Sequence, residues 1–258
     1  MADLDRRYGG ATVSRAGTHE IDEGLRAYML SVYNYMAIGV AITGLLAYGV
    51  YMMAVTADPS AAVARLPNGA MLTEFGRLMF VSPLKWVLML APLGVVFLFS
   101  ARLNSMSVSG AQLTFWVFSG LMGASLSSIF LVYAHGSIAQ VFFISAATFG
   151  ALSLWGYTTK KDISGWGSFL FMGLIGIIIA SVVNIFLASG ALQFAVSVIG
   201  VLIFAGLTAY DTQSIKEMYF EGDSDVVAGR KAISGALRLY LDFINLFIML
   251  LSLFGSRD

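Results

Sequence analysis

Seven apolar segments, each about as long as a membrane-spanning helix, dominate the sequence. A bilayer core about 30 Å thick needs roughly 20 apolar residues in a helix. Because 58% of the residues are apolar and only 12% are charged, one soluble core could not bury this surface, and lipid must solvate the rest. The sequence therefore predicts an all-α integral membrane protein that is a seven-transmembrane-helix bundle in a lipid bilayer. The predicted spans are 27–55, 83–101, 112–133, 137–157, 166–187, 192–210 and 237–254.

The first 26 residues are polar and contain four arginines. They show neither the apolar core nor the small-residue cleavage site of a secretory signal peptide. We interpret residues 1–26 as a cytoplasmic polar tail and residues 27–258 as one seven-helix transmembrane domain. Its longest predicted connections are 56–82 and 211–236.

The distribution of basic residues predicts the orientation, because cytoplasmic loops retain lysine and arginine. With a cytoplasmic N-terminus, eleven of the 15 basic residues fall on the cytoplasmic side and four on the other. Seven full spans would then place the C-terminus outside. The last segment is short, however, and it carries Arg238 and Asp242. A re-entrant final hairpin is therefore an alternative.

The composition also argues against several classes of function. Basic and acidic residues are balanced at 15 each, which disfavours nucleic acid as a partner. The absence of cysteine excludes disulfides and thiolate chemistry. Ser125 has no suitable base nearby in the predicted helices, and the last span has no lysine for a Schiff base. We expect neither an enzyme nor a tightly bound cofactor.

Two acidic residues, Asp211 and Asp242, lie at or within apolar spans, where an ionisable side chain is costly and usually functional. We expect both at the cytoplasmic ends of their helices. Successive antiparallel helices are usually neighbours, so the two carboxyl groups could lie side by side.

Two adjacent carboxyl groups in a partly dry site should share a proton, which makes such a pair a proton sensor. When both are ionised, they offer the oxygen ligands that Ca²⁺ prefers. Asn245, three residues after Asp242, could add an amide oxygen from the same helix face. In the structural alternative, Asp211 only caps its helix or extends to the interface, and Asp242 only bonds a neighbouring helix.

Two motifs near the C-terminus carry a family resemblance. Residues 210–215 read Tyr-Asp-Thr-Gln-Ser-Ile, and residues 239–247 read Leu-Tyr-Leu-Asp-Phe-Ile-Asn-Leu-Phe. Asn184-Ile185-Phe186 and residues 33–36, Tyr-Asn-Tyr-Met, add weaker support. With these motifs the sequence resembles the bacterial branch of the transmembrane Bax inhibitor motif family, from about residue 24 to residue 255.

This resemblance implies a seven-helix fold with the last helix near the centre. It also implies a pH-sensitive calcium leak channel of the bacterial inner membrane, with Ca²⁺ as the permeant or regulatory ion. Asp211 and Asp242 match the family's gating aspartate pair, and Arg102 matches a basic residue that can latch onto it. Some members carry a glutamate earlier in the second helix, where this sequence has Ala91.

Two further functions remain open at this point. Some bacterial relatives are associated with a membrane-bound AAA protease, so the chain could be an interaction partner or modulator without transport activity. An intramembrane aspartate pair also suits a proton-coupled transporter. Calcium flux in liposomes would separate the first of these from a leak channel.

Overall fold

The computed structural model describes residues 13–257, and side chains from residue 23 onward. Within this part of the chain, seven helices are long and apolar enough to cross a membrane, as the sequence predicts. The long helices are α1 (Val13–Ala54), α3 (Leu84–Arg102), α4 (Val108–Leu126), α5 (His135–Thr158), α6 (Trp166–Leu187), α7 (Gly190–Glu217) and α8 (Asp225–Phe254).

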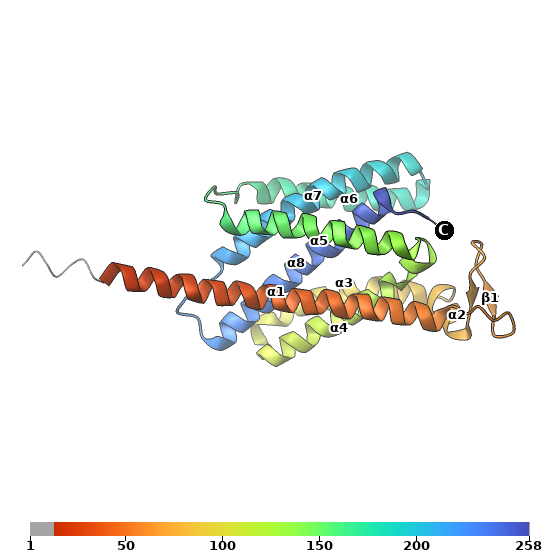
Figure 1. The fold of residues 1–258 in the computed structure, drawn as a ribbon, viewed down its shortest axis with the longest axis horizontal. Coiled ribbons are helices and arrows are strands. Elements are labelled where there is room, and N and C mark those ends of the chain that lie inside the picture. Colours follow the sequence, from red (N-terminus) through yellow and green to blue (C-terminus); the bar gives the residue numbers. More distant parts are fainter. Residues whose placement is uncertain (1–12, 258) are drawn as a thin grey trace, which may run out of the picture.

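Most of the long helices lie close to the long axis of the molecule, which is horizontal in Figure 1, and α4 and α8 are inclined to it. α1 begins at one end of the bundle and the α5–α6 turn lies at the same end, whereas the last residues of α8 lie at the other. The connection after α1 is folded at that second end, because Thr73 donates its backbone N–H to the carbonyl of Ala54 at 3.0 Å. The connection consists of β1 (Ala64–Arg65), β2 (Met71–Leu72) and α2 (Glu74–Phe80). Two 3₁₀ turns follow α3 and α4, at Leu103–Ser105 and Ser127–Leu131.

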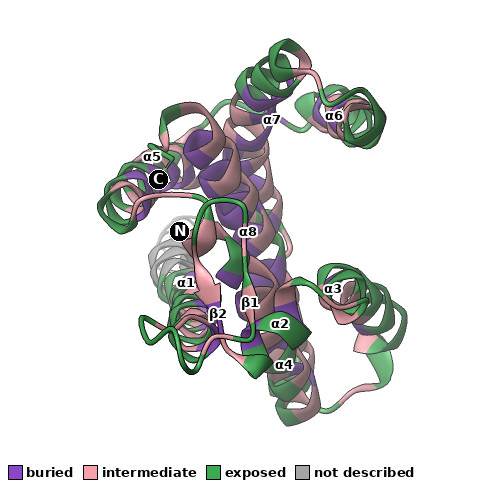
Figure 2. Ribbon diagram, turned by 90° about the vertical axis from the view of Figure 1, so that its right-hand side faces the viewer, coloured by how far each residue is buried: buried purple, intermediate pink, exposed green. Residues whose placement is uncertain are grey.

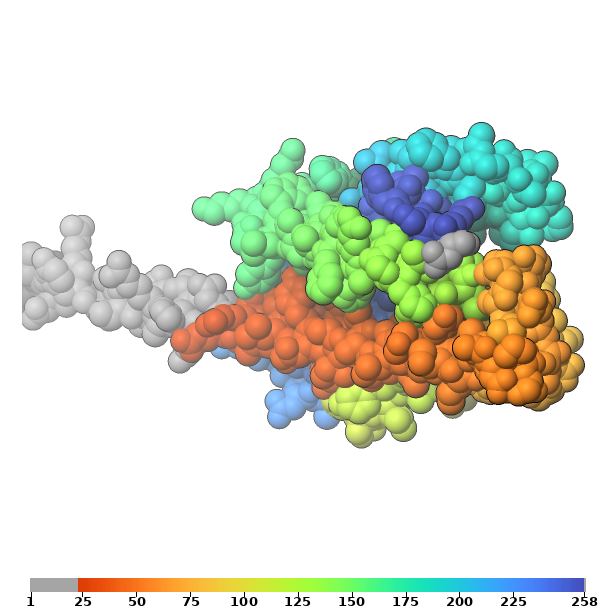
Figure 3. All heavy atoms as spheres, turned by 45° about the vertical axis from the view of Figure 1, so that its right-hand side comes forward, coloured from red at the N-terminus to blue at the C-terminus, as the bar shows by residue number. Residues whose placement is uncertain are grey.

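α8 forms the centre of the bundle. It contacts α1, α4, α5 and α7, and 56% of its most apolar stretch is buried, against 28% or less in every other described span. Figure 2 shows it between the group of α1, α3 and α4 and the group of α6 and α7. In the space-filling view its C-terminal part emerges between α5 and α7, while neighbouring helices cover most of its middle (Figure 3). The expected central last helix is therefore present.

The core of this arrangement is built around Tyr240 of α8, which is fully buried. Its ring packs edge-on against Phe115 and Phe118 of α4, with centroids 5.7 and 5.4 Å away. Its hydroxyl lies 2.6 Å from the hydroxyl of Thr43 in α1. Thr43 in turn donates to the carbonyl of Ser119 at 2.9 Å, so a satisfied polar contact joins three helices inside apolar surroundings.

The structure corrects the predicted connection 211–236. α7 continues to Glu217 and α8 starts at Asp225, so most of that segment is helical. The first turns of α8 contain charged residues, which lower the local hydropathy, but Ile233 and Ala236 on their inner face are fully buried. Lys231 closes the short turn with a 2.5 Å ion pair to Asp223. An amphipathic helix end of this kind escapes a search for continuous apolar stretches.

The re-entrant alternative for the final segment is wrong. α8 has 30 residues and runs the length of the bundle (Figure 1). The residues after it join the α4–α5 turn, where Ala134 donates its N–H to the carbonyl of Ser256 at 3.0 Å. Ser256 donates its own N–H to the hydroxyl of Ser137 at 2.9 Å. The two ends of the described chain therefore lie at opposite ends of the bundle.

The predicted polar tail is only partly described. α1 begins at Val13, so the second half of the segment 1–26 is helical and continuous with the first span. Residues 1–12 lie outside the described part of the chain, and the cytoplasmic location of the tail stays a prediction.

Candidate functional site

Asp211 and Asp242 lie side by side on α7 and α8, which are antiparallel neighbours. Their carboxyl groups are within hydrogen-bonding reach of one another. Asp242 is only 4% exposed, and the side chain of Asp211 is 15% exposed. Two acidic groups this close and this dry cannot both ionise without a large repulsion, so they form a site that can hold one proton between them.

The expected location at the helix ends holds approximately for Asp211, which lies within the last two turns of α7, but not for Asp242. α7 continues for more than a turn beyond Asp211, and α8 starts several turns before Asp242. The extra turns shield both carboxyl groups from the solvent at that end of the bundle. Asp242 consequently lies in the middle of the most buried helix.

Arg238 is the basic residue next to the pair. Its Nη1 lies 3.7 Å from Oδ1 of Asp211 and 3.4 Å from the hydroxyl of Ser214. Arg238 precedes Asp242 by four residues, which places both on one face of α8. That spacing was the available sequence signal, but the prediction from sequence used Arg238 only for the orientation and for the re-entrant alternative.

The structure does not bring Arg102 to the aspartate pair. Arg102 is the last residue of α3, and its side chain is exposed. Among the described residues, it forms no ion pair with a carboxylate, and the ion pair to Asp211 comes from Arg238.

Asn245 lies on the same stretch of α8 as Asp242 and lines the same cavity. Its side-chain nitrogen donates to the carbonyl of Leu241 at 2.8 Å. This bond fixes the side chain and leaves the amide oxygen as an acceptor. Asn245 therefore places an amide group on the same cavity wall as the two carboxyl groups.

A cavity of about 920 Å³ opens beside these residues, between α3, α6, α7 and α8. Asp211, Arg238, Asp242 and Asn245 contribute to its wall, and most of the remaining lining is apolar. α3 contributes Leu93 on the opposite side. Among the described residues, the only carboxyl groups that line this cavity are those of the aspartate pair.

Buried hydroxyl groups support α7 next to Asp211. The hydroxyl of Tyr33 in α1 lies 2.7 Å from that of Ser153 in α5, which lies 2.9 Å from the hydroxyl of Thr212 in α7. Thr212 also donates to the carbonyl of Thr208 at 2.7 Å. These bonds link three helices at the height of the aspartate pair.

Gln213 fixes the turn between α5 and α6. Its side-chain oxygen accepts from the N–H of Ile163 at 2.9 Å, and its side-chain nitrogen donates to the carbonyl of Lys161 at 2.9 Å. Lys216, one turn later, donates to the carbonyl of Tyr157 at 2.9 Å. The motif at residues 210–215 thus contains both an acidic residue of the site and a residue that anchors a turn.

The oxygen atoms at the site are fewer than a complete calcium shell needs. Ca²⁺ takes about six to eight oxygen ligands in its protein sites. The pair and Asn245 supply fewer, and the described residues contain no cluster of three or more His, Asp or Glu side chains that could hold a metal.

With seven apolar helices long enough to cross a membrane and a buried aspartate pair, the chain is a multi-pass membrane protein. The sequence model of the family described as "Inhibitor of apoptosis-promoting Bax1" matches residues 25–258. The chain therefore belongs to the Bax inhibitor-1-like family, as the sequence resemblance indicates.

Curated bacterial relatives cover almost the whole chain. The Inner membrane protein YbhL of Escherichia coli K12 is 46% identical, over 91% of this chain and 93% of its own length. An uncharacterized protein of Rickettsia prowazekii is 45% identical over 92% of each chain. An uncharacterized protein of Caulobacter vibrioides is 43% identical over 100% of this chain and 99% of its own.

Proposed function

We propose that the chain is a non-enzymatic, pH-sensitive calcium leak channel of the inner membrane, gated by Asp211 and Asp242. The observation that carries the proposal is the pair itself: two adjacent carboxyl groups, shielded from bulk solvent, in the wall of a cavity of about 920 Å³. An inner-membrane location is supported by the relative from Escherichia coli, which is named an inner membrane protein. A cytoplasmic N-terminus is supported by the excess of basic residues at that end.

At low pH the pair shares a proton and holds α7 against α8. We assign this proton to Asp242, because Asp242 is the more deeply buried residue and because Arg238 lies 3.7 Å from Asp211. Asp211 then carries the negative charge and accepts the hydrogen bond. The contact between the helices is closed in this state.

Loss of the shared proton places two negative charges beside each other in a dry environment. Arg238 can offset only part of the repulsion, since its side chain is 46% exposed and screened by solvent. The repulsion separates α7 and α8 on the side of the cavity, and the ionised pair attracts a divalent cation. The leak therefore increases as pH rises.

Purified protein in liposomes with a trapped calcium dye tests this function. We expect Ca²⁺ entry that exceeds protein-free liposomes and increases from acidic to neutral pH. Absence of flux at every pH would contradict the channel and favour the alternative of a partner of a membrane-bound AAA protease. Calcium flux that stops when the proton gradient is collapsed would instead favour a proton-coupled transporter.

A further inference from the structure

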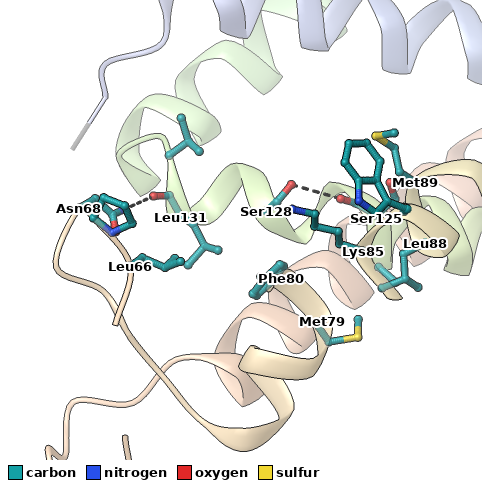
Figure 4. A pocket seen from close by; sticks show the side chains of 14 residues that line it. Leu66, Asn68, Met79, Phe80, Lys85, Leu88, Met89, Ser125, Ser128 and Leu131 are labelled. Carbon is teal, nitrogen blue, oxygen red and sulfur yellow. Dashed lines mark hydrogen bonds between the residues drawn. The ribbon is translucent and has the colours of Figure 1, made fainter. Parts of the chain in front are cut away.

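A second cavity, of about 510 Å³, lies at the end of the bundle where the β1–β2 hairpin packs. Its wall is formed by the hairpin, α2, the first turns of α3, and the end of α4 with the 3₁₀ turn that follows (Figure 4). The aspartate pair does not line it and belongs to a different cavity. We propose that this cavity binds an anionic phospholipid, with Lys85 holding the headgroup phosphate.

Lys85 supplies an uncompensated positive charge. It lines the cavity, and no Asp or Glu is among the lining residues. Within the described part of the chain, its ammonium group has neither a salt bridge nor a hydrogen bond, and its contact is with the face of Trp86, 5.2 Å from the ring centroid. An exposed lysine without an acidic partner, beside a membrane, attracts an anionic headgroup.

Polar groups near Lys85 suit the remainder of a headgroup. Ser128 and Ser125 lie on the wall toward which Lys85 projects (Figure 4). The hydroxyl of Ser128 donates to the carbonyl of Ser125 at 3.3 Å, while the hydroxyl of Ser125 has no protein partner among the described residues. Asn68 holds the hairpin over the cavity by donating to the carbonyl of Leu131 at 2.6 Å.

The apolar part of the lining favours a lipid over a free anion. Much of the remaining wall is apolar and is formed by Met79, Phe80, Leu88 and Met89. An inorganic anion makes no favourable contact with such a surface, whereas an acyl chain does. Trp86 is 52% exposed next to the charged group, as expected for an aromatic side chain at a membrane–water interface. A charged end and an apolar end in one cavity match a phospholipid with its headgroup at Lys85 and an acyl chain along α3.

Native mass spectrometry of the full chain in detergent tests this proposal. The protein is offered equal amounts of phosphatidylglycerol and phosphatidylcholine with identical acyl chains. We expect the wild type to retain the anionic lipid about five-fold more often, the factor that one interfacial lysine contributes. Lys85→Gln should reduce the ratio to about one, and Lys85→Arg should preserve it.

Arg65→Gln is the matched control. Arg65 is an exposed basic residue of the β1–β2 hairpin, and its side chain does not line the cavity. It should keep the wild-type ratio. Ala124→Leu leaves Lys85 in place but fills part of the cavity, so it should lower the ratio as well. Circular dichroism and gel filtration establish that each variant is folded.

Three outcomes of the lipid comparison would overturn the proposal: no lipid preference in the wild type, an equal preference in folded Lys85→Gln, or an equal loss in Arg65→Gln. In a last measurement, inorganic phosphate is added in excess and the amount of lipid that stays bound is compared. If it displaces the lipid completely, the site binds free anions and the lipid assignment is wrong. None of these outcomes bears on calcium flux, so failure here is distinct from failure of the proposed channel.

Discussion

The carboxyl group of Asp242 has a buried oxygen, Oδ2, that accepts no hydrogen bond from the described part of the chain. An ionised carboxylate with an unsatisfied buried oxygen is costly. A neutral group that shares its proton with Asp211 avoids most of this cost. In the proposed mechanism, this unsatisfied oxygen is the reason that the pair stays protonated and closed at low pH.

Replacing either aspartate with asparagine should flatten the pH response of the calcium leak. In the wild type, one titrating proton allows the flux to rise by up to about tenfold per pH unit. Asp211→Asn or Asp242→Asn keeps a hydrogen bond but removes one of the two charges, so the repulsion that opens the pair is lost. Flux into dye-loaded liposomes across the pH range measures the effect.

Asp162→Asn is the control for charge removal, because Asp162 is an exposed residue of the α5–α6 turn. Its pH profile should equal that of the wild type. Asp→Ala at either site removes the hydrogen bond as well, and should weaken both closure and Ca²⁺ binding. A steep and unaltered profile in both asparagine variants would place the sensor elsewhere.

Arg238→Gln should move the pH of half-maximal leak upward. The guanidinium group favours the ionised form of Asp211, so its removal makes loss of the shared proton harder. The shift should be less than about one pH unit, because the side chain is partly exposed and screened. The same flux assay measures it, and an unchanged midpoint would show that this ion pair has no part in gating.

Arg102→Ala tests the latch that the family resemblance implies. If Arg102 pairs with the aspartates in another conformation, the variant should show a higher leak at low pH, without loss of Ca²⁺ binding. If Arg102 serves only the positive-inside bias, the leak of the variant should match the wild type at every pH. Comparison with Arg238→Gln separates the two arginines.

At the scale of helices, Gln213→Leu should loosen the α5–α6 turn. The variant leaves the N–H of Ile163 and the carbonyl of Lys161 without partners, and Ile163 is fully buried. The expected loss of stability is about 1–3 kcal/mol. Trp155 and Trp166, whose rings stack 6.1 Å apart across this turn, report its opening by fluorescence during unfolding in detergent micelles.

Gln140→Leu provides the matched control, since Gln140 is an exposed residue of α5. It should unfold within about 0.5 kcal/mol of the wild type, as surface substitutions usually do. Equal stability of the two variants would show that the side chain of Gln213 does not hold the turn.

The sequence predicts the seven spans well because a bilayer imposes a fixed apolar length on each helix. It predicts helix ends poorly where a helix continues into water. The turns of α7 after Asp211 and of α8 before Leu237 carry charges on one face, and packing of the other face decides their structure. For the same reason the sequence indicated Asp211 and Asp242 but missed Arg238, whose role depends on where α8 begins.

At the scale of the whole molecule, cysteine labelling tests the orientation. Ser14→Cys and Asp162→Cys should resist an impermeant thiol reagent in intact cells, because the α1 start and the α5–α6 turn lie at one end of the bundle (Figure 1). Ser256→Cys, at the opposite end and exposed, should react. The native chain has no cysteine, so the background is clean. The reverse pattern would invert the proposed orientation.

The central position of α8 also constrains how the protein is made. Among the seven described spans this helix is synthesised last, after the four helices that pack against it. Its partners α1, α4, α5 and α7 cannot bury their inner faces until it arrives. The bundle therefore cannot finish folding until α8 has left the ribosome, and a nascent chain stalled before Asp225 would be an assembly intermediate exposed to quality-control proteases.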